Sequence, residues 1–203
     1  ITAEPIKANA VERGVSSPQE RLRAIKRLTD LGVSVTLRLR PYIIGISDDF
    51  KKLIPMAKEA GADSVTTEFF CLEARADDRL KKKYKEMSKY CGFDLWEFYR
   101  KNSHGSGYRR LNYEIKRPII NEMQNLAHKL DMRFYVSDAH HKEKSDYCSC
   151  CGVPPQWKVS KGQFAEAILI AKNRKDGLVF WKDVEPDAKE IVSNVGYYKA
   201  AGF

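Results

Sequence analysis

Two arginines followed by a glycine-containing loop are the first residues in the chain with recognisable chemistry. Arg38 and Arg40 are two positions apart, so both lie on one face if this segment is a strand. Pro41 and a largely apolar stretch follow, and then Gly45, whose lack of a side chain lets backbone groups approach a ligand closely. Ligands of α/β proteins bind at the carboxyl ends of strands, where this loop would lie. The stretch 36–48 therefore predicts a small-molecule site.

The densest group of reactive side chains is formed by Cys148, Cys150 and Cys151. Three sulfurs in so short a segment are too crowded for ordinary core packing, and they favour a metal ion or an iron-sulfur cluster. Four further residues could complete a coordination shell: Asp138, His140, His141 and Asp146. The cysteine spacing matches no standard zinc pattern, so structural or redox-active cysteines are the alternative.

Helices and strands that could position these groups alternate along the first third of the chain. The expected elements are a helix over 18–31, a strand over 33–39, a helix over 48–60 and a strand over 64–70. The first helix begins at a capping box formed by Ser17 and Glu20. A repeat of about 30 residues is typical of βα units with right-handed crossovers. The sequence therefore predicts an α/β fold with a parallel sheet, whose helices stack on one side of a barrel wall.

Apolar spacing also predicts which side chains of the first helix and strand are buried. In the helix the apolar residues lie three positions apart, and in the strand they alternate. The expected helical core positions are Leu22, Ile25, Leu28 and Leu31. The expected strand core positions are Val33, Val35, Leu37 and Leu39.

The rest of the chain is expected to contain an insertion and an extension. Helical segments interrupt the barrel pattern over about 75–107, and a helix from about Tyr113 and a strand over 133–136 then resume it. Residues 1–137 are thus expected to form the barrel part of the protein. Residues 138–203 are expected to form a cysteine-containing C-terminal extension.

The sequence opens at Ile1 without an initiator methionine, a signal peptide or a leading polar tail. This position is where the end of an earlier barrel strand is expected. We therefore expect the chain to be the C-terminal part of a longer polypeptide, whose remaining N-terminal part is its first partner. A wedge of three barrel strands alone would leave an open edge.

Four segments together resemble a known family: residues 1–5 (Ile-Thr-Ala-Glu-Pro), 17–25 (Ser-Pro-Gln-Glu-Arg-Leu-Arg-Ala-Ile), 38–48 (Arg-Leu-Arg-Pro-Tyr-Ile-Ile-Gly-Ile-Ser-Asp) and 150–155 (Cys-Cys-Gly-Val-Pro-Pro). They resemble the C-terminal half of radical S-adenosylmethionine proteins, especially the spore-photoproduct-lyase-like group. The resemblance implies the C-terminal part of a partial (β/α)6-type parallel barrel. It also implies reductive cleavage of S-adenosylmethionine followed by hydrogen-atom abstraction from a substrate.

The resemblance further implies roles for residues along the barrel. Thr2 and Glu4 would face the ribose and amino-acid part of S-adenosylmethionine. Arg38 or Arg40 would lie near its carboxylate, which a guanidinium binds through two parallel charge-assisted hydrogen bonds. The adenine would be held by the backbone around four residues, Ile43, Ile44, Gly45 and Ile46.

The catalytic [4Fe-4S] cluster of that family is bound by three cysteines spaced Cys-x3-Cys-x2-Cys, and this spacing does not occur here. The chain alone therefore cannot hold the cluster. The cluster is expected to be bound mainly by the missing N-terminal part, and Cys148 to Cys151 could bind an additional iron-sulfur cluster or zinc ion.

Glu68 and Cys71 lie at the end of the strand expected over 64–70. At that end of a barrel strand the Cys71 thiol would face the barrel mouth, where it could donate a hydrogen atom to a substrate radical. The alternative for Cys71 is a small buried hydrophobic residue. Glu68 is expected to contact the substrate.

Composition limits the remaining possibilities. The 203 residues are 43% apolar, enough for one substantial core, and no apolar run reaches the length of a membrane span. Five cysteines and no signal peptide favour a reducing, cytoplasmic setting. The sequence thus predicts a soluble protein with no membrane partner.

A net charge of +9 leaves a second function open. Basic residues gather at 79–85, 109–110 and 116–117, with Tyr84, Tyr108 and Tyr113 among them. Such a surface could follow a phosphate backbone and stack bases, or it could be no more than a solvated helix face. The alternative to the enzyme is therefore a non-catalytic, metal-stabilised module that binds nucleic acid.

Overall fold

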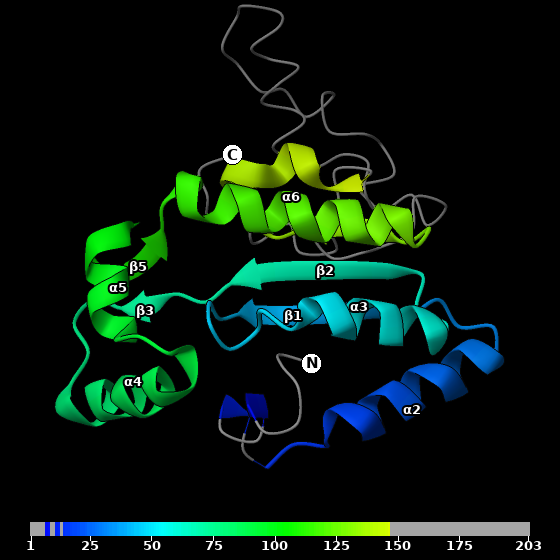
Figure 1. Ribbon diagram of the computed structural model, residues 1–203, viewed down its shortest axis with the longest axis horizontal. Coiled ribbons are helices and arrows are strands. Elements are labelled where there is room, and N and C mark those ends of the chain that lie inside the picture. The colour runs from blue at the N-terminus through cyan, green and yellow to red at the C-terminus, as the bar shows by residue number, and fades with distance from the viewer. Residues whose placement is uncertain (1–6, 9–10, 13, 147–203) are drawn as a thin grey trace, which may run out of the picture. The chain divides into compact units, whose positions relative to one another are not determined.

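A computed structural model of the chain describes residues 7–8, 11–12 and 14–146 (Figure 1). The chain divides after Gly152 into two units, and every described residue belongs to the first. None of the helices in these ranges is long and apolar enough to cross a lipid bilayer.

Three parallel strands form the main sheet of this unit. They are β1 (Thr36–Tyr42), β2 (Ser64–Phe69) and β6 (Arg133–Val136), in the order β1-β2-β6. Helix α2 (Pro18–Asp30) precedes β1, α3 (Phe50–Glu59) connects β1 to β2, and α6 (Tyr113–Lys129) leads into β6. The expected α/β fold with a parallel sheet is confirmed. Within the described ranges the strands form an open sheet and no barrel.

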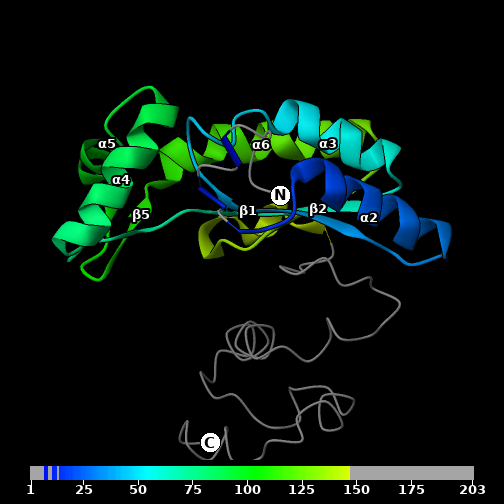
Figure 2. The same ribbon diagram turned by 90° about the horizontal axis from the view of Figure 1, so that it is seen from below.

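The register of the strands gives the sheet one apolar face. Two rows of aligned residues run across β1, β2 and β6: Leu37, Val65 and Phe134, and then Leu39, Thr67 and Val136. All six side chains are buried. Helices α3 and α6 pack on this side, as Figure 2 shows. This layer, with apolar residues of both helices, forms the core.

The opposite face of the sheet is polar. The corresponding row there is Arg38, Thr66 and Tyr135, because side chains alternate along each strand. At the start of the strands the hydroxyl groups of Thr36 and Ser64 lie 2.7 Å apart. A parallel sheet in which both faces are covered by helices has apolar residues on both, whereas this second face is polar. Arg38 is exposed on it, while Thr66 and Tyr135 are buried.

Helix α2 begins as expected and buries less than expected. The side chain of Ser17 accepts a hydrogen bond from the Glu20 amide, and the Glu20 carboxylate accepts one from the Ser17 amide, so the capping box is confirmed. Leu22 and Ile25 are buried, but Leu28 and Leu31 are exposed. Their predicted burial was wrong: in the last turn of α2 it is Thr29 that faces the end of α3, where its hydroxyl donates a hydrogen bond of 3.0 Å to the Ala60 carbonyl oxygen.

The first strand begins later in the chain than its sequence pattern suggests. It starts at Thr36 and extends to Tyr42, with an irregular register between Leu39 and Tyr42. Val33 is exposed, so its predicted burial was also wrong. The residues before Thr36 connect α2 to the sheet, and the Val35 carbonyl accepts a hydrogen bond from the Asp63 amide.

A continuous segment between β2 and α6 forms a second layer beyond the carboxyl ends of β1 and β2 (Figure 1). Its helices are α4 (Asp78–Cys91) and α5 (Leu95–Asn102). Its strands are β3 (Leu72–Glu73), β4 (Ser103–His104) and β5 (Tyr108–Leu111), which form a small antiparallel sheet in the order β3-β5-β4. This segment contains the helical insertion expected over about 75–107.

A buried and an exposed leucine give a stability prediction with a matched control. Leu39 is 0% exposed and Leu31 is 80% exposed. Leu39→Ala is expected to lower the free energy of unfolding by about 2–5 kcal/mol, because it leaves a cavity beneath α3. Leu31→Ala is expected to change it by no more than about 0.5 kcal/mol. Urea denaturation followed by circular dichroism measures both, and equal effects would contradict the assignment of these residues.

Candidate functional site

A cavity of about 490 Å³ lies at the carboxyl ends of β2 and β6. Its polar and reactive lining residues are Glu68, Cys71, His104, Arg110, Lys116, Ser137, Asp138 and His140, and its apolar ones are Phe69, Phe70 and Leu111. Glu68 and Cys71, the two residues proposed from the sequence for catalysis, thus border the same space. A larger hollow, lined by Asp63 and Arg133 among others, lies at the amino ends of the strands. Parallel sheets bind ligands at their carboxyl ends, so we take the smaller cavity as the candidate site.

Glu68 is held by an arginine of the neighbouring strand. Its carboxylate forms an ion pair with the guanidinium of Arg40 across β1 and β2, on the polar face of the sheet. Both side chains are partly exposed. The sequence proposed Arg40 for a cofactor carboxylate and Glu68 for the substrate, whereas the structure joins the two. A ligand carboxylate at Arg40 would therefore compete with Glu68.

Cys71 lies two residues beyond the end of β2, directly before β3, and is half-buried. Its thiol lies 3.7 Å from the carbonyl oxygen of Phe69 and can donate a hydrogen bond to it. Burial raises the pKa of the thiol above its ordinary value, while the nearby positive charge of Arg110 opposes that shift. The group therefore remains S–H at neutral pH, so it is better suited to donate a hydrogen than to act as a thiolate nucleophile.

A buried ion pair forms one wall of the cavity. Lys116 Nζ lies 2.5 Å from Asp138 Oδ2, and the two side chains are 3% and 13% exposed. Asp138 Oδ1 also accepts a hydrogen bond of 3.0 Å from the backbone amide of His140. Burial alone would raise the pKa of Asp138, but the hydrogen bond and positive charge of Lys116 hold it below its usual value. Asp138 is thus ionised and fixed in place.

Two histidines border the cavity from different elements. His104 lies on β4, and its Nδ1 is 3.0 Å from Asn112 Oδ1. His140 lies in the 3₁₀ segment η1 (Ala139–Lys144), and its ring approaches that of His104 edge-on at 6.2 Å between centroids. Both rings line the cavity.

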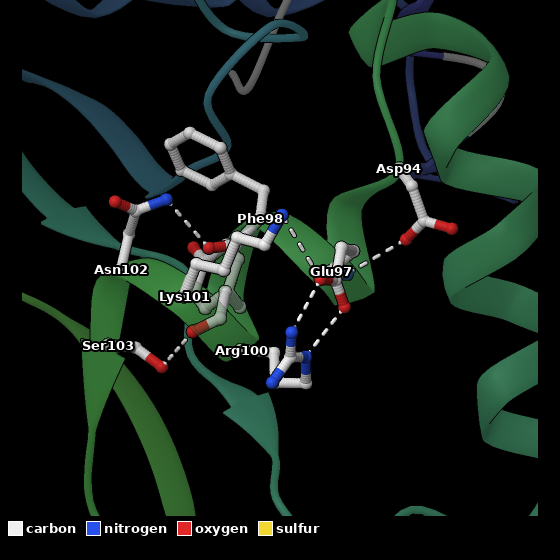
Figure 3. A network of polar contacts seen from close by, with 8 residues as sticks. Asp94, Glu97, Phe98, Arg100, Lys101, Asn102 and Ser103 are labelled. Atoms are coloured by element: carbon white, nitrogen blue, oxygen red, sulfur yellow. Dashed lines mark hydrogen bonds and ion pairs between the residues drawn. The ribbon is translucent and has the colours of Figure 1, made fainter.

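The position of His104 depends on the end of α5, which Figure 3 shows. Asp94 caps the helix by accepting a hydrogen bond from the Glu97 amide, and Glu97 pairs with both Arg100 and Lys101. The side chain of Ser103 donates a hydrogen bond to the Tyr99 carbonyl oxygen at the point where α5 ends. These contacts fix the direction in which the chain leaves α5 for β4.

Hydrogen bonds within the chain hold the loop that follows β1. Ile43 and Ile46 are buried. The Ile43 amide donates to Ser47 Oγ at 3.0 Å, the Gly45 amide donates to Asp48 Oδ2 at 3.1 Å, and the Gly45 carbonyl accepts from Lys7 Nζ at 2.9 Å. These backbone groups, expected from the sequence to hold adenine, already have partners within the chain.

Gly45 is required by the fold at this loop. Its φ is +81°, and a Cβ atom there would lie 2.6 Å from the backbone oxygen of Cys91. The close approach expected at Gly45 is therefore made by the end of α4. The sequence correctly indicated a position that needs glycine, but the neighbouring group is part of the chain itself.

Several residues proposed from the sequence cannot be assigned to the cavity. Arg38 lies on the polar face of the sheet, and Ile44 lies partly buried in the loop after β1. Thr2, Glu4, Cys148, Cys150 and Cys151 lie outside the described residues. Their proposed roles stay predictions.

Metal binding finds no ready site in the described ranges. No group of three or more histidine, cysteine, aspartate or glutamate side chains there could hold a metal ion. Asp146, a proposed ligand, pairs with His128 and accepts a hydrogen bond from the Phe134 amide. His141 is buried with its ring stacked on Tyr113, the centroids being 4.4 Å apart, and burial lowers its pKa.

The basic residues do not form one continuous surface with the tyrosines. Tyr84 is buried and stacks on Trp96, and Lys116 is committed to Asp138. Tyr113 stacks on His141, and only Tyr108 of the three tyrosines lacks such a ring partner among the described residues. Base stacking at Tyr84, as considered from the sequence, would need the core beneath α4 to open.

From the sequence, Lys116 and Arg110 were considered only as part of a basic surface and not as residues of this cavity. Lys116 lies four positions before Ile120 on the buried stripe of α6. A lysine on such a stripe signals a buried partner, and this pattern could have identified it. Arg110 offers no comparable signal, because the antiparallel pairing of β5 with β4 decides which side it faces.

Comparison of the chain with models of protein families, with curated proteins and with solved structures found no match. The assignment of a function therefore depends on the geometry described above.

A comparison with Gly92 separates the two costs of a side chain at Gly45, the left-handed backbone conformation and the collision with Cys91. Gly92 has nearly the same φ, +80°, but a Cβ atom there would meet nothing within 4 Å. Gly92→Ala is expected to cost about 1 kcal/mol, the usual cost of a left-handed conformation. Gly45→Ala is expected to cost clearly more, because the new atom also collides with Cys91. Thermal unfolding compares them, and equal losses would show that the contact with Cys91 is not restrictive.

The Lys116–Asp138 pair predicts a dependence of stability on pH. At pH 7, Lys116→Met leaves a buried carboxylate without its cation and is expected to cost about 3–5 kcal/mol. The folded pKa of Asp138 is depressed, so in the parent protein its contribution is present above the ordinary pKa of about 4 and is lost as pH falls through the folded pKa. The difference between parent and variant should therefore shrink below about pH 4. Urea titrations at several pH values test this, and a constant difference would contradict it.

Proposed function

We propose that this chain is the substrate-binding and cofactor-binding part of a radical S-adenosylmethionine enzyme, in which Cys71 donates a hydrogen atom to a substrate radical. The observation that carries the proposal is the protonated, half-buried Cys71 thiol in a cavity at the carboxyl ends of parallel strands. The polar face of the sheet and the four segments that resemble this family support it. The proposal includes the finer reading of the fold as part of a (β/α)6-type barrel completed by other strands.

The residues of this chain suit one part of S-adenosylmethionine but not the [4Fe-4S] cluster. The cysteine spacing for the catalytic [4Fe-4S] cluster is absent, and the described residues contain no substitute set of ligands, so the cluster does not fit this chain and belongs to another part of the enzyme. Arg38 on the polar face suits the carboxylate of S-adenosylmethionine, whereas Arg40 is paired with Glu68. The loop 43–46 does not suit adenine, because its backbone groups are bonded internally.

The bound cofactor would supply the radical that removes a hydrogen atom from the substrate. The residues of this chain then have separate tasks. Glu68, aligned by Arg40, accepts hydrogen bonds from the substrate, and the Lys116–Asp138 pair holds the wall of the cavity. Cys71 gives its hydrogen atom to the product radical, so that the S–H bond breaks and a C–H bond forms. A one-electron donor and a proton then restore the thiol.

The proposal is tested in the anaerobically purified native polypeptide that contains this chain. The Cys71 thiol exchanges its hydrogen with solvent, so a reaction in D₂O is expected to place deuterium in the product. Cys71→Ala is expected to remove that label and to lower product formation at least about 100-fold, the scale of a lost proton or hydrogen donor.

Cys91→Ala is the matched control. Cys91 is also a free cysteine, but it packs near Gly45 and does not line the cavity. This variant is expected to keep both product formation and the label. Absence of iron and sulfide from the native polypeptide, or an unchanged label in the Cys71 variant, would contradict the proposal.

A further inference from the structure

The charged groups of the cavity are unequally compensated. Its two carboxylates each have a cation: Glu68 pairs with Arg40, and Asp138 pairs with Lys116. Arg110 also lines the cavity, and among the described residues it has no ion-pair partner. One permanent positive charge therefore faces the cavity without a counter-ion from the described part of the chain.

Arg110 lies close enough to Cys71 for its charge to act on the thiol. It is the largest electrostatic influence that lowers the pKa of Cys71, against the effect of burial. An anionic group bound to Arg110 would thus lie next to the sulfur. Since Arg110 is exposed on β5, it can reach such a group without first breaking a contact with another described residue.

The amino end of α6 adds to the positive potential on this side. Leu111 and Lys116, which flank the first turn of α6, both line the cavity. Asn112 occupies the N-cap position, but its side chain makes no capping hydrogen bond and contacts His104 instead. The first turn of a helix carries N–H groups without helical partners and a partial positive charge, which favour an anion nearby.

We propose that Arg110 binds the anionic group, a phosphate or a carboxylate, of a ligand whose apolar part lies against Phe69, Phe70 and Leu111. This arrangement holds the ligand beside the Cys71 thiol. As a description of the substrate the inference rests on the proposed function, whereas the anion site itself can be tested without S-adenosylmethionine. A guanidinium suits either anion, because its parallel N–H groups match two oxygen atoms.

Alkylation of Cys71 in the full chain tests this site with two reagents of similar size. Iodoacetate carries a negative charge and iodoacetamide is neutral, and mass spectrometry of the Cys71 peptide measures each rate. The ratio of the two rates cancels any change in the fraction of thiolate. Arg110→Gln is expected to lower this ratio about threefold, the scale of one partly exposed ion pair. Arg110→Lys keeps the positive charge, so the ratio of the iodoacetate rate to the iodoacetamide rate should stay close to that of the parent chain.

Arg27→Gln serves as the control for net charge, because Arg27 is exposed on α2 and does not line the cavity. It should leave the ratio unchanged. An equal fall in the Arg27 and Arg110 variants, or no fall in either, would overturn the proposal.

Competition identifies the class of anion. In the parent chain, inorganic phosphate or acetate is expected to slow alkylation by neutral iodoacetamide, and Arg110→Gln should abolish that protection. Protection by phosphate at lower concentration than acetate assigns a phosphate ligand, and the reverse assigns a carboxylate. If neither anion protects Cys71, the site is rejected, and this result would leave the separate test for deuterium transfer unaffected.

Discussion

The register between β1, β2 and β6 is the constraint on which the other features depend. Side chains alternate along a strand, so a shift by one residue would exchange the two faces of the sheet. In the observed register, aligned apolar residues meet α3 and α6, and Arg40 meets Glu68 on the other side. Burial of the apolar rows fixes the register, and the register in turn places the ion pair at the carboxyl end of the sheet.

Two ion pairs at the carboxyl end of the sheet differ in how strongly their surroundings restrict them. The Lys116–Asp138 pair is nearly buried, so its geometry is restricted and its loss is costly. The Arg40–Glu68 pair is partly exposed, so water screens it and a ligand can replace one partner. The Lys116–Asp138 pair therefore stabilises the fold, whereas a ligand can replace one partner of the Arg40–Glu68 pair. Cys71 lines the same cavity, and its half-buried environment keeps its sulfur protonated.

Much of the fold could be predicted from the sequence, because local patterns determine it. The capping box at Ser17, the alternation at Leu37 and Leu39, and the helix beginning at Tyr113 all gave correct elements. Burial of Leu28 and Leu31 could not be judged, since their periodicity does not show whether a neighbouring element covers them.

The site was predictable only where strand ends determine it. Glu68 and Cys71 follow from their place at the end of β2, because parallel strands bring their carboxyl ends together. The pairing of Arg40 with Glu68 required the register. The approach of Cys91 to Gly45 and the contribution of Arg110 required the tertiary path of the segment between β2 and α6.

That segment runs without interruption from Leu72 to Leu111, and among the described strands its three short ones pair only with one another. It leaves the main sheet after β2 and returns at α6, so its length does not alter the register of β1, β2 and β6. Evolution could therefore change its length without shifting the main sheet, provided that its buried residues, among them Tyr84, Leu95 and Tyr99, still pack on the core. Because it supplies His104 and Arg110, such a change would alter ligand specificity and leave the thiol at Cys71 in place.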